Sequence, residues 1–448
     1  MKQMQAVVIG AGPAGYEAAL QLGRAGVKTL LIEKNKEQIG GVCLNEGCIP
    51  TKNYLQCAEF ATKASLFSDY GLQMESKGLD IHQLLNKTQS LKNELRSGVV
   101  WLLEQAGVEI FYGSASFIDP YHIDVSGETI GFERCIVATG SQTKEAENLP
   151  LDGRRIISSR EVFEMQSLPS SVTIVGGGPI GCEFATFFST FGTEVTMIVR
   201  GPQLLSKEDE DVSKALLRSF KKRSIQVFTS ADILGVQVNN ERVELLLKTE
   251  NEEQITCETL LCAIGRVPRT KELKLENAAI RQDEKGFIEV NEAFQTSQKH
   301  IYAVGDCIDT PGYAHTAYAE GKIAAHNIIT GQTAINTHVS PSAIFSDPQI
   351  ASCGLNEKEA KKQGYAFDVK KVFFKANAKA KIAGDDSGFI KLIACSQTNE
   401  VLGACIVGMQ ATELIHQLLL AVEKKLTIKE LSALIHVHPT LSEIISQL

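Results

Sequence analysis

Two cysteines in this sequence have a spacing that could support redox chemistry. Cys43 and Cys48 are separated by four residues within the glycine-containing segment 40–52. Five residues of regular helix rise about 7.5 Å, whereas a disulfide needs Cα atoms within about 6.8 Å of one another. The pair can therefore form a bridge only if the backbone is distorted, which Gly47 permits. A helix starting near Pro50 would favour a thiolate at Cys48, so we expect a redox pair and not two unconnected buried thiols.

A histidine near the C-terminus could serve as the proton acceptor for such a pair. His438 precedes Pro439, which disfavours helical geometry at the histidine and presents it from a bend. Glu443 is near enough in sequence to hold one ring nitrogen and leave the other for a thiol proton. Thr440 and Glu443 also have the spacing of a helix capping box, which is a purely structural interpretation. The cysteine pair favours the catalytic interpretation.

Composition restricts the classes of protein to which this chain could belong. Of its 448 residues, 44% are hydrophobic and 22% charged, and the formal net charge is -8. These are ordinary values for a globular protein of about three domains, and the negative charge argues against binding to nucleic acid or anionic membranes. We expect no membrane span and no secretion signal, because the apolar runs are too short. The scattered cysteines fit neither a secreted disulfide framework nor a zinc cluster, so we expect a cytoplasmic protein without a metal.

Two copies of a strand, a glycine-rich turn and a helix are the elements expected to position this chemistry. Their glycines are Gly10, Gly12 and Gly15 in the first copy and Gly176, Gly178 and Gly181 in the second. Such turns let a pyrophosphate approach the amides at a helix N-terminus. Each copy is closed by a later strand that ends in a small-residue turn, at Gly140 and at Gly265. The chain therefore contains two dinucleotide-binding units.

The two copies differ where an adenosine ribose would bind. Glu33 ends the strand expected at 28–33, where a carboxylate can accept hydrogen bonds from both ribose hydroxyls. The corresponding position of the second copy is Val199, followed by Arg200. An arginine here can pair with a 2′-phosphate, although a solvated arginine at a strand end is equally compatible. The second copy therefore favours binding of NADP, or binding of both NAD and NADP.

The order of the expected elements predicts how the domains are connected. Helical periodicity at 51–64 and 80–106 indicates an insertion in the first copy. The strand at 300–306 ends in Gly-Asp after the second copy has closed, so we expect the chain to return there to the first domain. From about residue 336 short alternating strands followed by helices indicate an α+β domain. The expected α/β fold thus has two Rossmann-like domains, the second inserted in the first, and its boundaries are 1–146 with 270–335, 147–269, and 336–448.

Taken together, these motifs resemble the flavin-dependent pyridine nucleotide-disulfide oxidoreductases over essentially the whole chain. The shared segments, in the order of the family, are 10–15, 43–52, 138–140, 176–181, 301–306 and 436–443. The resemblance is strongest to members that oxidise protein-bound dihydrolipoamide to lipoamide and reduce NAD. It implies a redox-active Cys43–Cys48 disulfide, FAD, and a homodimer formed through residues 336–448. It further implies a partner that bears lipoyl groups, as a subunit of a 2-oxo acid dehydrogenase or glycine cleavage complex.

The same resemblance implies roles for individual residues. Cys43 would exchange with substrate, Cys48 would lie against the flavin, and His438 with Glu443 would be an acid–base pair reaching the site from the partner subunit. The residues implied for FAD are Gly10, Gly12, Gly15, Glu33, Lys52, Gly140, Asp306 and Ala314. Those implied for the nicotinamide nucleotide are Gly176, Gly178, Gly181, Glu183 and Gly265, with Lys52 and Glu183 beside the ring, and Arg200 is a candidate from its position after the second copy's strand and not from the resemblance. The resemblance implies NAD, but lipoamide-oxidising members usually carry glutamate where this chain has Val199 followed by Arg200, so NADP stays an alternative.

Two other functions fit parts of the sequence. A reductase passing electrons from NADPH to a low-molecular disulfide or to a metal ion such as mercuric is favoured by Arg200. The C-terminal residues 446–448 lack the cysteine pair that this family uses for mercuric ion. A flavin-binding subunit with an idle redox centre is disfavoured by the intact cysteines and the His438–Glu443 pair. A comparison of turnover with lipoamide and with glutathione disulfide would distinguish the NADPH-dependent reductase from an enzyme that oxidises dihydrolipoamide.

Overall fold

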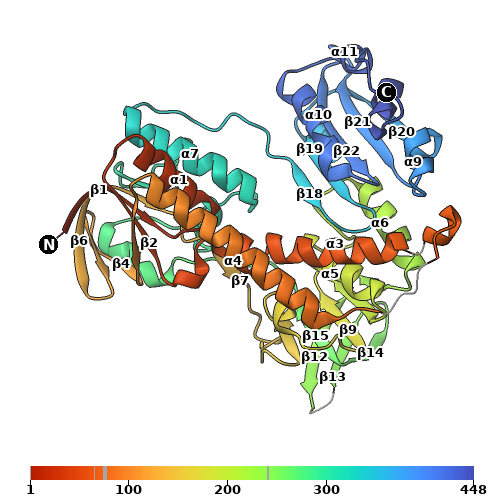
Figure 1. Cartoon of the computed structure of the whole chain (residues 1–448), viewed down its shortest axis with the longest axis horizontal. Coiled ribbons are helices and arrows are strands. Elements are labelled where there is room, and N and C mark those ends of the chain that lie inside the picture. The colour runs from red at the N-terminus through yellow and green to blue at the C-terminus, as the bar shows by residue number, and fades with distance from the viewer. Residues whose placement is uncertain (1, 65, 74–77, 240–241) are drawn as a thin grey trace. The chain divides into compact units, whose positions relative to one another are not determined.

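The chain forms two compact units of discontinuous sequence (Figure 1). The computed structural model describes residues 2–64, 66–73, 78–239 and 242–448. Unit 1 comprises Met1–Thr51, Gln83–Lys144 and Gly265–Thr337, and unit 2 comprises Lys52–His82, Glu145–Ile264 and His338–Leu448.

Unit 1 is built on a seven-stranded sheet in the order β3-β2-β1-β6-β5-β4, with β17 paired to β6. Its strands are β1 (Lys2–Ile9), β2 (Thr29–Glu33), β3 (Glu109–Tyr112), β4 (Ala115–Asp119), β5 (His122–Val125), β6 (Glu128–Val137) and β17 (Ile301–Ala303). The centre of the sheet is parallel, and β1 and β2 contain buried apolar runs at residues 6–9 and 30–32, as expected for strands covered on both faces. The parallel pairing of β17 with β6 confirms that the chain returns to the first sheet.

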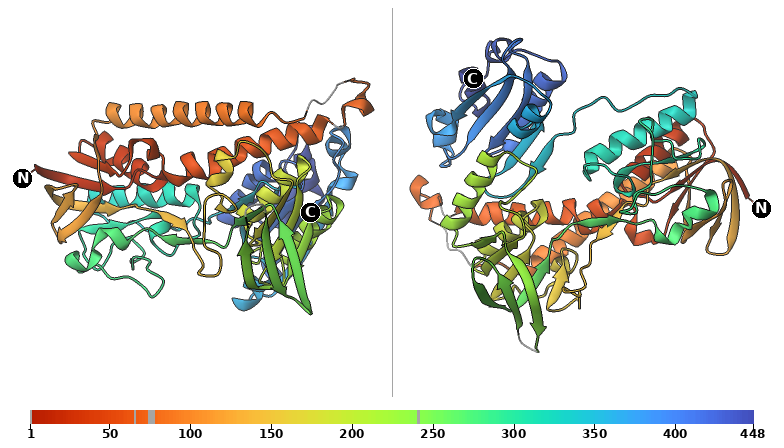
Figure 2. Two further views of the ribbon diagram at one scale, coloured as in Figure 1. Left: turned by 90° about the horizontal axis from the view of Figure 1, so that it is seen from below. Right: turned by 180° about the vertical axis from the view of Figure 1, so that it is seen from behind.

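Helices cover this sheet and carry the first group of functional residues. They are α1 (Pro13–Arg24), α2 (Gly41–Glu46), α4 (Ile81–Gln105) and α7 (Ala314–Thr330), while α3 (Cys48–Ala64) begins in unit 1 and belongs to unit 2 from Lys52 onward. The predicted helical insertion is confirmed by α3 and α4. Within unit 1, α1 and α7 lie side by side (Figures 1 and 2). A short antiparallel pair, β7 (Ser141–Thr143) with β16 (Arg266–Pro268), also belongs to this unit.

Unit 2 contains the second glycine turn in a parallel sheet of order β11-β10-β9-β15-β8. The strands are β8 (Ile156–Ser158), β9 (Ser171–Val175), β10 (Glu194–Val199), β11 (Gln226–Thr229) and β15 (Thr259–Cys262), with helices α5 (Pro179–Thr190) and α6 (Glu210–Lys222). An antiparallel sheet is formed by β12 (Asp232–Val238), β13 (Val243–Lys248) and β14 (Glu252–Cys257). The sheets of units 1 and 2 confirm the α/β fold with two Rossmann-like repeats.

The C-terminal part of unit 2 is an antiparallel sheet of order β18-β19-β22-β21-β20. Its strands are β18 (Ser342–Ile344), β19 (Ile350–Gly354), β20 (Phe367–Phe373), β21 (Phe389–Cys395) and β22 (Val401–Val407). Its helices are α8 (Glu357–Lys362), α9 (Ala378–Ile382), α10 (Ala411–Glu423), α11 (Ile428–Ser432) and the 3-10 helix η8 (Leu441–Gln447). A core of apolar residues from β21, β22, α10 and η8 confirms the expected α+β domain.

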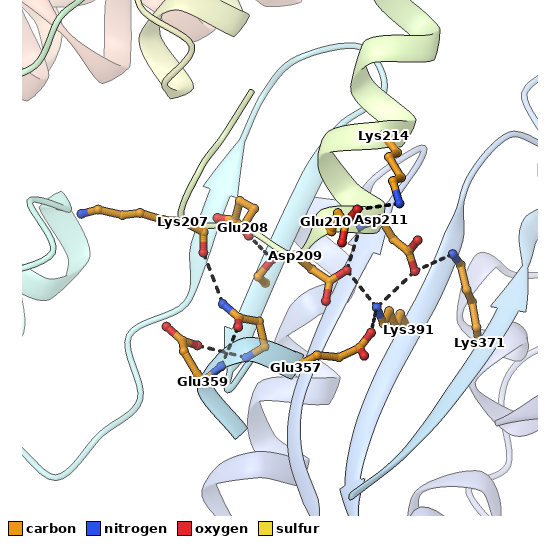
Figure 3. Close-up of polar contacts among 12 residues, drawn as sticks. Lys207, Glu208, Asp209, Glu210, Asp211, Lys214, Glu357, Glu359, Lys371 and Lys391 are labelled. Atoms are coloured by element: carbon orange, nitrogen blue, oxygen red, sulfur yellow. Dashed lines mark hydrogen bonds and ion pairs between the residues drawn. The ribbon is translucent and has the colours of Figure 1, made fainter. Parts of the chain in front are cut away.

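A buried lysine ties α6 to this C-terminal sheet (Figure 3). The ammonium of Lys391, on β21, lies 2.8 Å from an oxygen of Asp209 and 3.1 Å from one of Asp211, and it also pairs with Glu357. Burial alone would lower the pKa of Lys391, but its hydrogen bonds to Asp209, Glu357 and Asp211 raise the pKa above the ordinary value. The three carboxylates are close enough to hold a metal ion, yet the ammonium lies among them and supplies the positive charge.

Candidate active site

The two cysteines lie on separate helices with a break between them. Helix α2 carries Cys43 and ends at Glu46, and α3 begins at Cys48. Gly47 between them has φ -137° and ψ -112°, which is outside the helical region. The distortion expected at Gly47 is therefore present. Both cysteines are half-buried, and their disulfide remains a prediction.

The cysteine segment packs directly on the first glycine turn. Gly40 and Gly41 have left-handed φ angles of 89° and 66°, and the amide of Gly40 donates to the carbonyl of Ala11 at 2.8 Å. A Cβ on Gly41 would lie 2.6 Å from the Cα of Gly12, so only glycine allows this approach. The position of Cys43 is thus set by backbone contact with the turn that opens α1.

Asn45 and Arg96, which were not selected from the sequence, fix helix α2, the helix that carries Cys43. Asn45 is buried on α2 and donates to the carbonyls of Ile39 and Gly41 at 3.0 and 2.8 Å. Its own side-chain oxygen accepts a bond of 2.7 Å from the guanidinium of Arg96 on α4. Nothing in local sequence connects Arg96 with Asn45, because the two are brought together only by the helical insertion.

The first glycine turn has the geometry of a pyrophosphate site. A Cβ on Gly10 would lie 2.3 Å from the carbonyl oxygen of Ala138, and one on Gly15 would lie 1.8 Å from the carbonyl oxygen of Gly10. Helix α1 has no side-chain cap at Gly12, which leaves its first amides available to an anion. The buried hydroxyl of Thr139 has no hydrogen-bond partner among the described residues. These features fit a bound dinucleotide such as FAD.

Glu33 is already held at this turn in the position expected for a ribose ligand. Its two carboxylate oxygens accept hydrogen bonds of 2.8 Å from the amides of Ala11 and Lys34. Burial raises the pKa of Glu33, and these amide hydrogen bonds oppose the rise. The carboxylate is therefore oriented by the backbone before any ligand binds.

Asp306 is fixed by two residues that sequence reasoning did not select. It lies in the 3-10 helix η6 (Gly305–Cys307) and accepts a bond of 2.6 Å from the hydroxyl of Ser141. Nε of Arg266 donates to that hydroxyl at 2.7 Å, and burial lowers the pKa of Arg266. Ser141 and Arg266 each directly follow a closing glycine, at Gly140 and Gly265, and that position is the signal that could have identified them.

Helix α7 holds the same segment from the other side. The buried carboxylate of Glu320 accepts a bond of 2.7 Å from the amide of Gly305. Burial raises the pKa of Glu320, while bonds from Thr310 and Gly305 counteract part of the rise. Ala314, implied to lie near the flavin ring, is the first residue of α7.

The second glycine turn repeats the first in unit 2. A Cβ on Gly176 would lie 2.2 Å from the carbonyl oxygen of Ala263, and one on Gly181 would lie 2.3 Å from the carbonyl oxygen of Gly176. Gly178 precedes α5 without a side-chain cap, and a Cβ there would meet nothing within 4 Å. The open space and uncapped amides fit a nicotinamide nucleotide.

A partly buried ion pair lies one turn into α5. Both oxygens of Glu183, which is 4% exposed, lie 2.8 Å from Nζ of Lys52. The amide of Phe345 donates to Glu183 at 3.0 Å, and the Lys52 ammonium lies 4.6 Å from the centre of the Phe345 ring. The structure thus brings together Lys52 and Glu183, the two residues implied to lie beside the nicotinamide ring, and adds Phe345.

The ribose end of the second turn is lined by apolar and donor groups. A Cβ on Gly177 would lie 2.8 Å from a methyl group of the buried Val199. Arg200 is exposed, and the buried amide nitrogen of Gln203 has no hydrogen-bond partner within the described part of the chain. A carboxylate corresponding to Glu33 is replaced here by methyl groups.

His438 and Glu443 form a pair in unit 2. Nδ1 of His438 lies 2.8 Å from one oxygen of Glu443, and the other oxygen accepts the amide of Thr440 at 2.8 Å. The hydrogen bonds from Thr440 and His438 lower the pKa of Glu443. The catalytic and capping interpretations are therefore compatible, since one carboxylate makes both contacts. His438 is exposed, and its contact with Glu443 is made by Nδ1 and not by Nε2.

The candidate site residues are distributed over the two units. Unit 1 holds Gly10, Gly12, Gly15, Glu33, Cys43, Cys48, Gly140, Gly265, Asp306 and Ala314. Unit 2 holds Lys52, Gly176, Gly178, Gly181, Glu183, Arg200, His438 and Glu443. Among the described residues, none of the helices has the length and apolar character needed to cross a membrane.

Comparison with known proteins gives matches along almost the entire chain. Residues 4–321 match the family of pyridine nucleotide-disulphide oxidoreductases, and residues 340–448 match the dimerisation domain of that family. The dihydrolipoyl dehydrogenase of Thermus scotoductus is 36% identical, covering 99% of this chain and 96% of the relative. That of Bacillus subtilis is 34% identical over 98% of this chain and 94% of the relative.

Solved structures of two further proteins have the same fold. LpdA of Mycobacterium tuberculosis has a TM-score of 0.91 at 26% identity, covering 99% of this chain and 98% of that one. The HOCl-induced flavoprotein disulfide reductase RclA of Escherichia coli has a TM-score of 0.89 at 26% identity, covering 99% of both chains. A Cu(II) complex of RclA is similar to this chain to the same degree, with a TM-score of 0.89.

Proposed function

The chain belongs to the pyridine nucleotide-disulphide oxidoreductase family, and from this we propose that it oxidises protein-bound dihydrolipoamide to lipoamide with reduction of NAD. The observation that carries the proposal is the packing of the Cys43 helix on the glycine turn that fits FAD. That contact supports a redox-active disulfide next to a dinucleotide site. When bound, FAD supplies the two-electron chemistry between dithiol and nicotinamide that no side chain can provide.

The proposed reaction begins with a proton transfer to His438. Nε2 of His438, with Nδ1 held by Glu443, takes the proton of one dihydrolipoyl thiol. The resulting thiolate attacks the sulfur of Cys43, so a substrate–Cys43 disulfide forms, the Cys43–Cys48 bond breaks, and Cys48 leaves as a thiolate. The second substrate thiol then loses its proton to solvent and attacks the substrate sulfur bonded to Cys43, which breaks the substrate–Cys43 disulfide, releases cyclic lipoamide and leaves Cys43 as a thiolate. Two electrons and two protons thus leave the substrate.

The remaining assignments of the proposal concern domains and partners. We assign residues 1–146 and 270–335 to FAD binding, 147–269 to nucleotide binding and 336–448 to the subunit interface. The match to a dimerisation domain supports a homodimer, in which His438 is supplied by the partner subunit. The proposed partner protein is a lipoyl-bearing subunit of a 2-oxo acid dehydrogenase or glycine cleavage complex. The cysteine content supports a reducing, cytoplasmic location.

Turnover of dihydrolipoamide with NAD and with NADP by the purified flavoprotein tests the proposal. We expect fast turnover with NAD, and loss of that turnover in Cys48→Ser because the bridge cannot form. Cys57→Ser is a matched control, since Cys57 is also half-buried on α3. Full lipoamide turnover by Cys48→Ser would contradict the reaction described above.

A second candidate function is reduction of a low-molecular disulfide or a metal ion by NADPH. It is favoured by the methyl groups of Val199 at Gly177, by the exposed Arg200, and by the similarity to RclA, a disulfide reductase solved with Cu(II). Preference for NADPH, with reduction of glutathione disulfide or Cu(II) and poor lipoamide turnover, would select this alternative.

A further inference from the structure

Two tyrosines form a hydrogen-bonded pair between α1 and α7 of unit 1. The hydroxyl oxygens of Tyr16 and Tyr318 lie 2.6 Å apart, although the residues are 302 positions apart in sequence. Their rings meet edge to face, with centroids 5.6 Å apart and an angle of 68°. Both side chains are half-buried. The mechanism proposed above makes no use of either hydroxyl.

The packing of three helices brings this pair towards the cysteines. Tyr16 lies one turn beyond Gly12, to whose carbonyl its amide donates at 2.9 Å. Gly12 contacts Gly41, the first residue of the helix that carries Cys43. On the other side, Gly321 of α7 packs so closely on Ala14 that a Cβ would lie 2.3 Å from its carbonyl oxygen. The first turn of α1 therefore contacts both the start of α2 and the middle of α7, and the tyrosine pair joins α1 and α7 next to these contacts.

Charged and titratable groups around the pair indicate which neighbouring groups could accept a hydrogen bond from it. Burial raises the pKa of Tyr16, its hydrogen bond with Tyr318 opposes part of this rise, and the charges of Glu17 and Cys43 add to it. Burial also raises the pKa of Tyr318, and further causes are its bond to Tyr16 and the charges of Cys43 and Cys48. Glu17 has its own cation, because Nζ of Lys322 lies 3.8 Å from it. Both phenols thus stay protonated near neutral pH, with the cysteines as their titratable neighbours.

The two tyrosine hydroxyls leave one O–H group that can donate a hydrogen bond to a neighbouring cysteine. Two phenols carry two O–H protons, and one of these lies in the bond between them. The second O–H can donate outwards, and a hydrogen-bond donor stabilises a thiolate more than a thiol. A neutral pair can therefore favour the charged form of a nearby cysteine without introducing a cation.

We propose that the Tyr16–Tyr318 pair donates a hydrogen bond to the thiolate formed at Cys43 when lipoamide is released from it. The pair would hold this sulfur in its reactive form and orientation during exchange with substrate. This inference rests on the proposed function and adds two residues to its thiol chemistry. It involves no change in the atoms exchanged, because the O–H proton stays on the tyrosine.

The pH dependence of Cys43 alkylation tests the role of the pair. The full-length flavoprotein, reduced with dithiothreitol, is treated with iodoacetamide at a series of pH values, and peptide mass mapping follows Cys43 separately from Cys48. In Tyr318→Phe we expect the midpoint of alkylation to move upward by about one pH unit, since a thiolate loses a hydrogen bond. Tyr16→Phe should give a shift in the same direction. Bound flavin and the melting temperature of each variant show whether it is folded.

A matched variant separates this role from a general effect of removing a hydroxyl. Tyr302 is buried in the same unit, and its hydroxyl accepts from Gln295 at 3.4 Å. Tyr302→Phe should retain the wild-type midpoint. An unchanged midpoint in both Tyr16→Phe and Tyr318→Phe, or an equal shift in Tyr302→Phe, overturns the inference. Alkylation measures the Cys43 thiol directly and does not depend on lipoamide turnover. If the wild type failed to turn over lipoamide, the proposed function would be contradicted, but the effect of each tyrosine on Cys43 could still be measured.

Discussion

Val199 lies against Gly177 at the position where, in the first glycine turn, Glu33 binds the backbone. A Cβ on Gly177 would be 2.8 Å from a methyl group of Val199, whereas Glu33 accepts the amide of Ala11 at 2.8 Å. The second turn therefore offers a ribose no carboxylate at this point. The exposed Arg200 next to it can pair with a phosphate.

Restoring the carboxylate should change the choice of nucleotide. In Val199→Glu we expect the ratio of kcat/KM for NAD to that for NADP to rise about tenfold or more, since a charged acceptor bonds the ribose and repels a 2′-phosphate. The measurement is steady-state dihydrolipoamide oxidation with each nucleotide. Val199→Ala removes methyl groups without adding an acceptor and should leave the ratio near the wild-type value. If the ratio of kcat/KM for NAD to that for NADP were the same in the wild type, Val199→Glu and Val199→Ala, position 199 would not select the nucleotide.

Removing the buried ammonium of Lys391 should strongly destabilise the fold. Lys391→Met leaves the carboxylates of Asp209, Asp211 and Glu357 without their central cation, and we expect a loss of about 3–5 kcal/mol in the free energy of unfolding. Urea titration followed by circular dichroism measures it. Lys371→Met is the control, because Lys371 pairs with Asp211 at a more exposed position and should cost about 1 kcal/mol or less. Equal losses in the two variants would contradict a special role for the buried lysine.

The same ion cluster predicts a dependence of stability on pH. Burial would raise the pKa of Asp211, but hydrogen bonds from Lys371 and Lys391 lower it overall. A lowered folded-state pKa means that the stabilisation is complete above the ordinary carboxyl value of about 4 and is lost as pH falls below it. Melting temperatures between pH 3 and pH 7 should therefore drop at the acid end. Asp211→Asn should flatten this drop, and an unchanged acid dependence in that variant would contradict the assignment.

The parts of the site that were predictable from sequence depend on local backbone constraints. The glycine turns, Glu33 at a strand end and the break at Gly47 each follow from a few neighbouring residues, and the structure contains all three. The return of the chain to the first domain was predictable because a strand ending in Gly-Asp follows after the second copy has closed, and the structure shows this return as the pairing of β17 with β6.

The parts that were not predictable depend on contacts between distant segments. Arg266, Ser141 and Asp306 form one chain of hydrogen bonds, although 125 positions separate the first two and 165 the last two. Lys391 lies in a strand whose pattern gives no sign that a lysine there is buried. Such contacts are decided by which surfaces the whole chain packs together, and no periodicity in the sequence records them.

The His438–Glu443 pair provides a last prediction that separates catalysis from capping. His438→Gln removes the proton acceptor, and we expect dihydrolipoamide turnover to fall by about 10²–10⁴-fold while the melting temperature changes little, because His438 is exposed. Glu443→Gln can keep the bond to the Thr440 amide but cannot hold the histidine as a carboxylate does, so turnover should fall with the 3-10 helix η8 intact. The lowered pKa of Glu443 keeps it ionised above its ordinary value of about 4.3, so its own protonation should not limit activity near neutral pH. His436→Gln, two positions away, is the control and should retain turnover. A loss in His436→Gln equal to that in His438→Gln would show that the loop as a whole, and not the His438–Glu443 pair, is required.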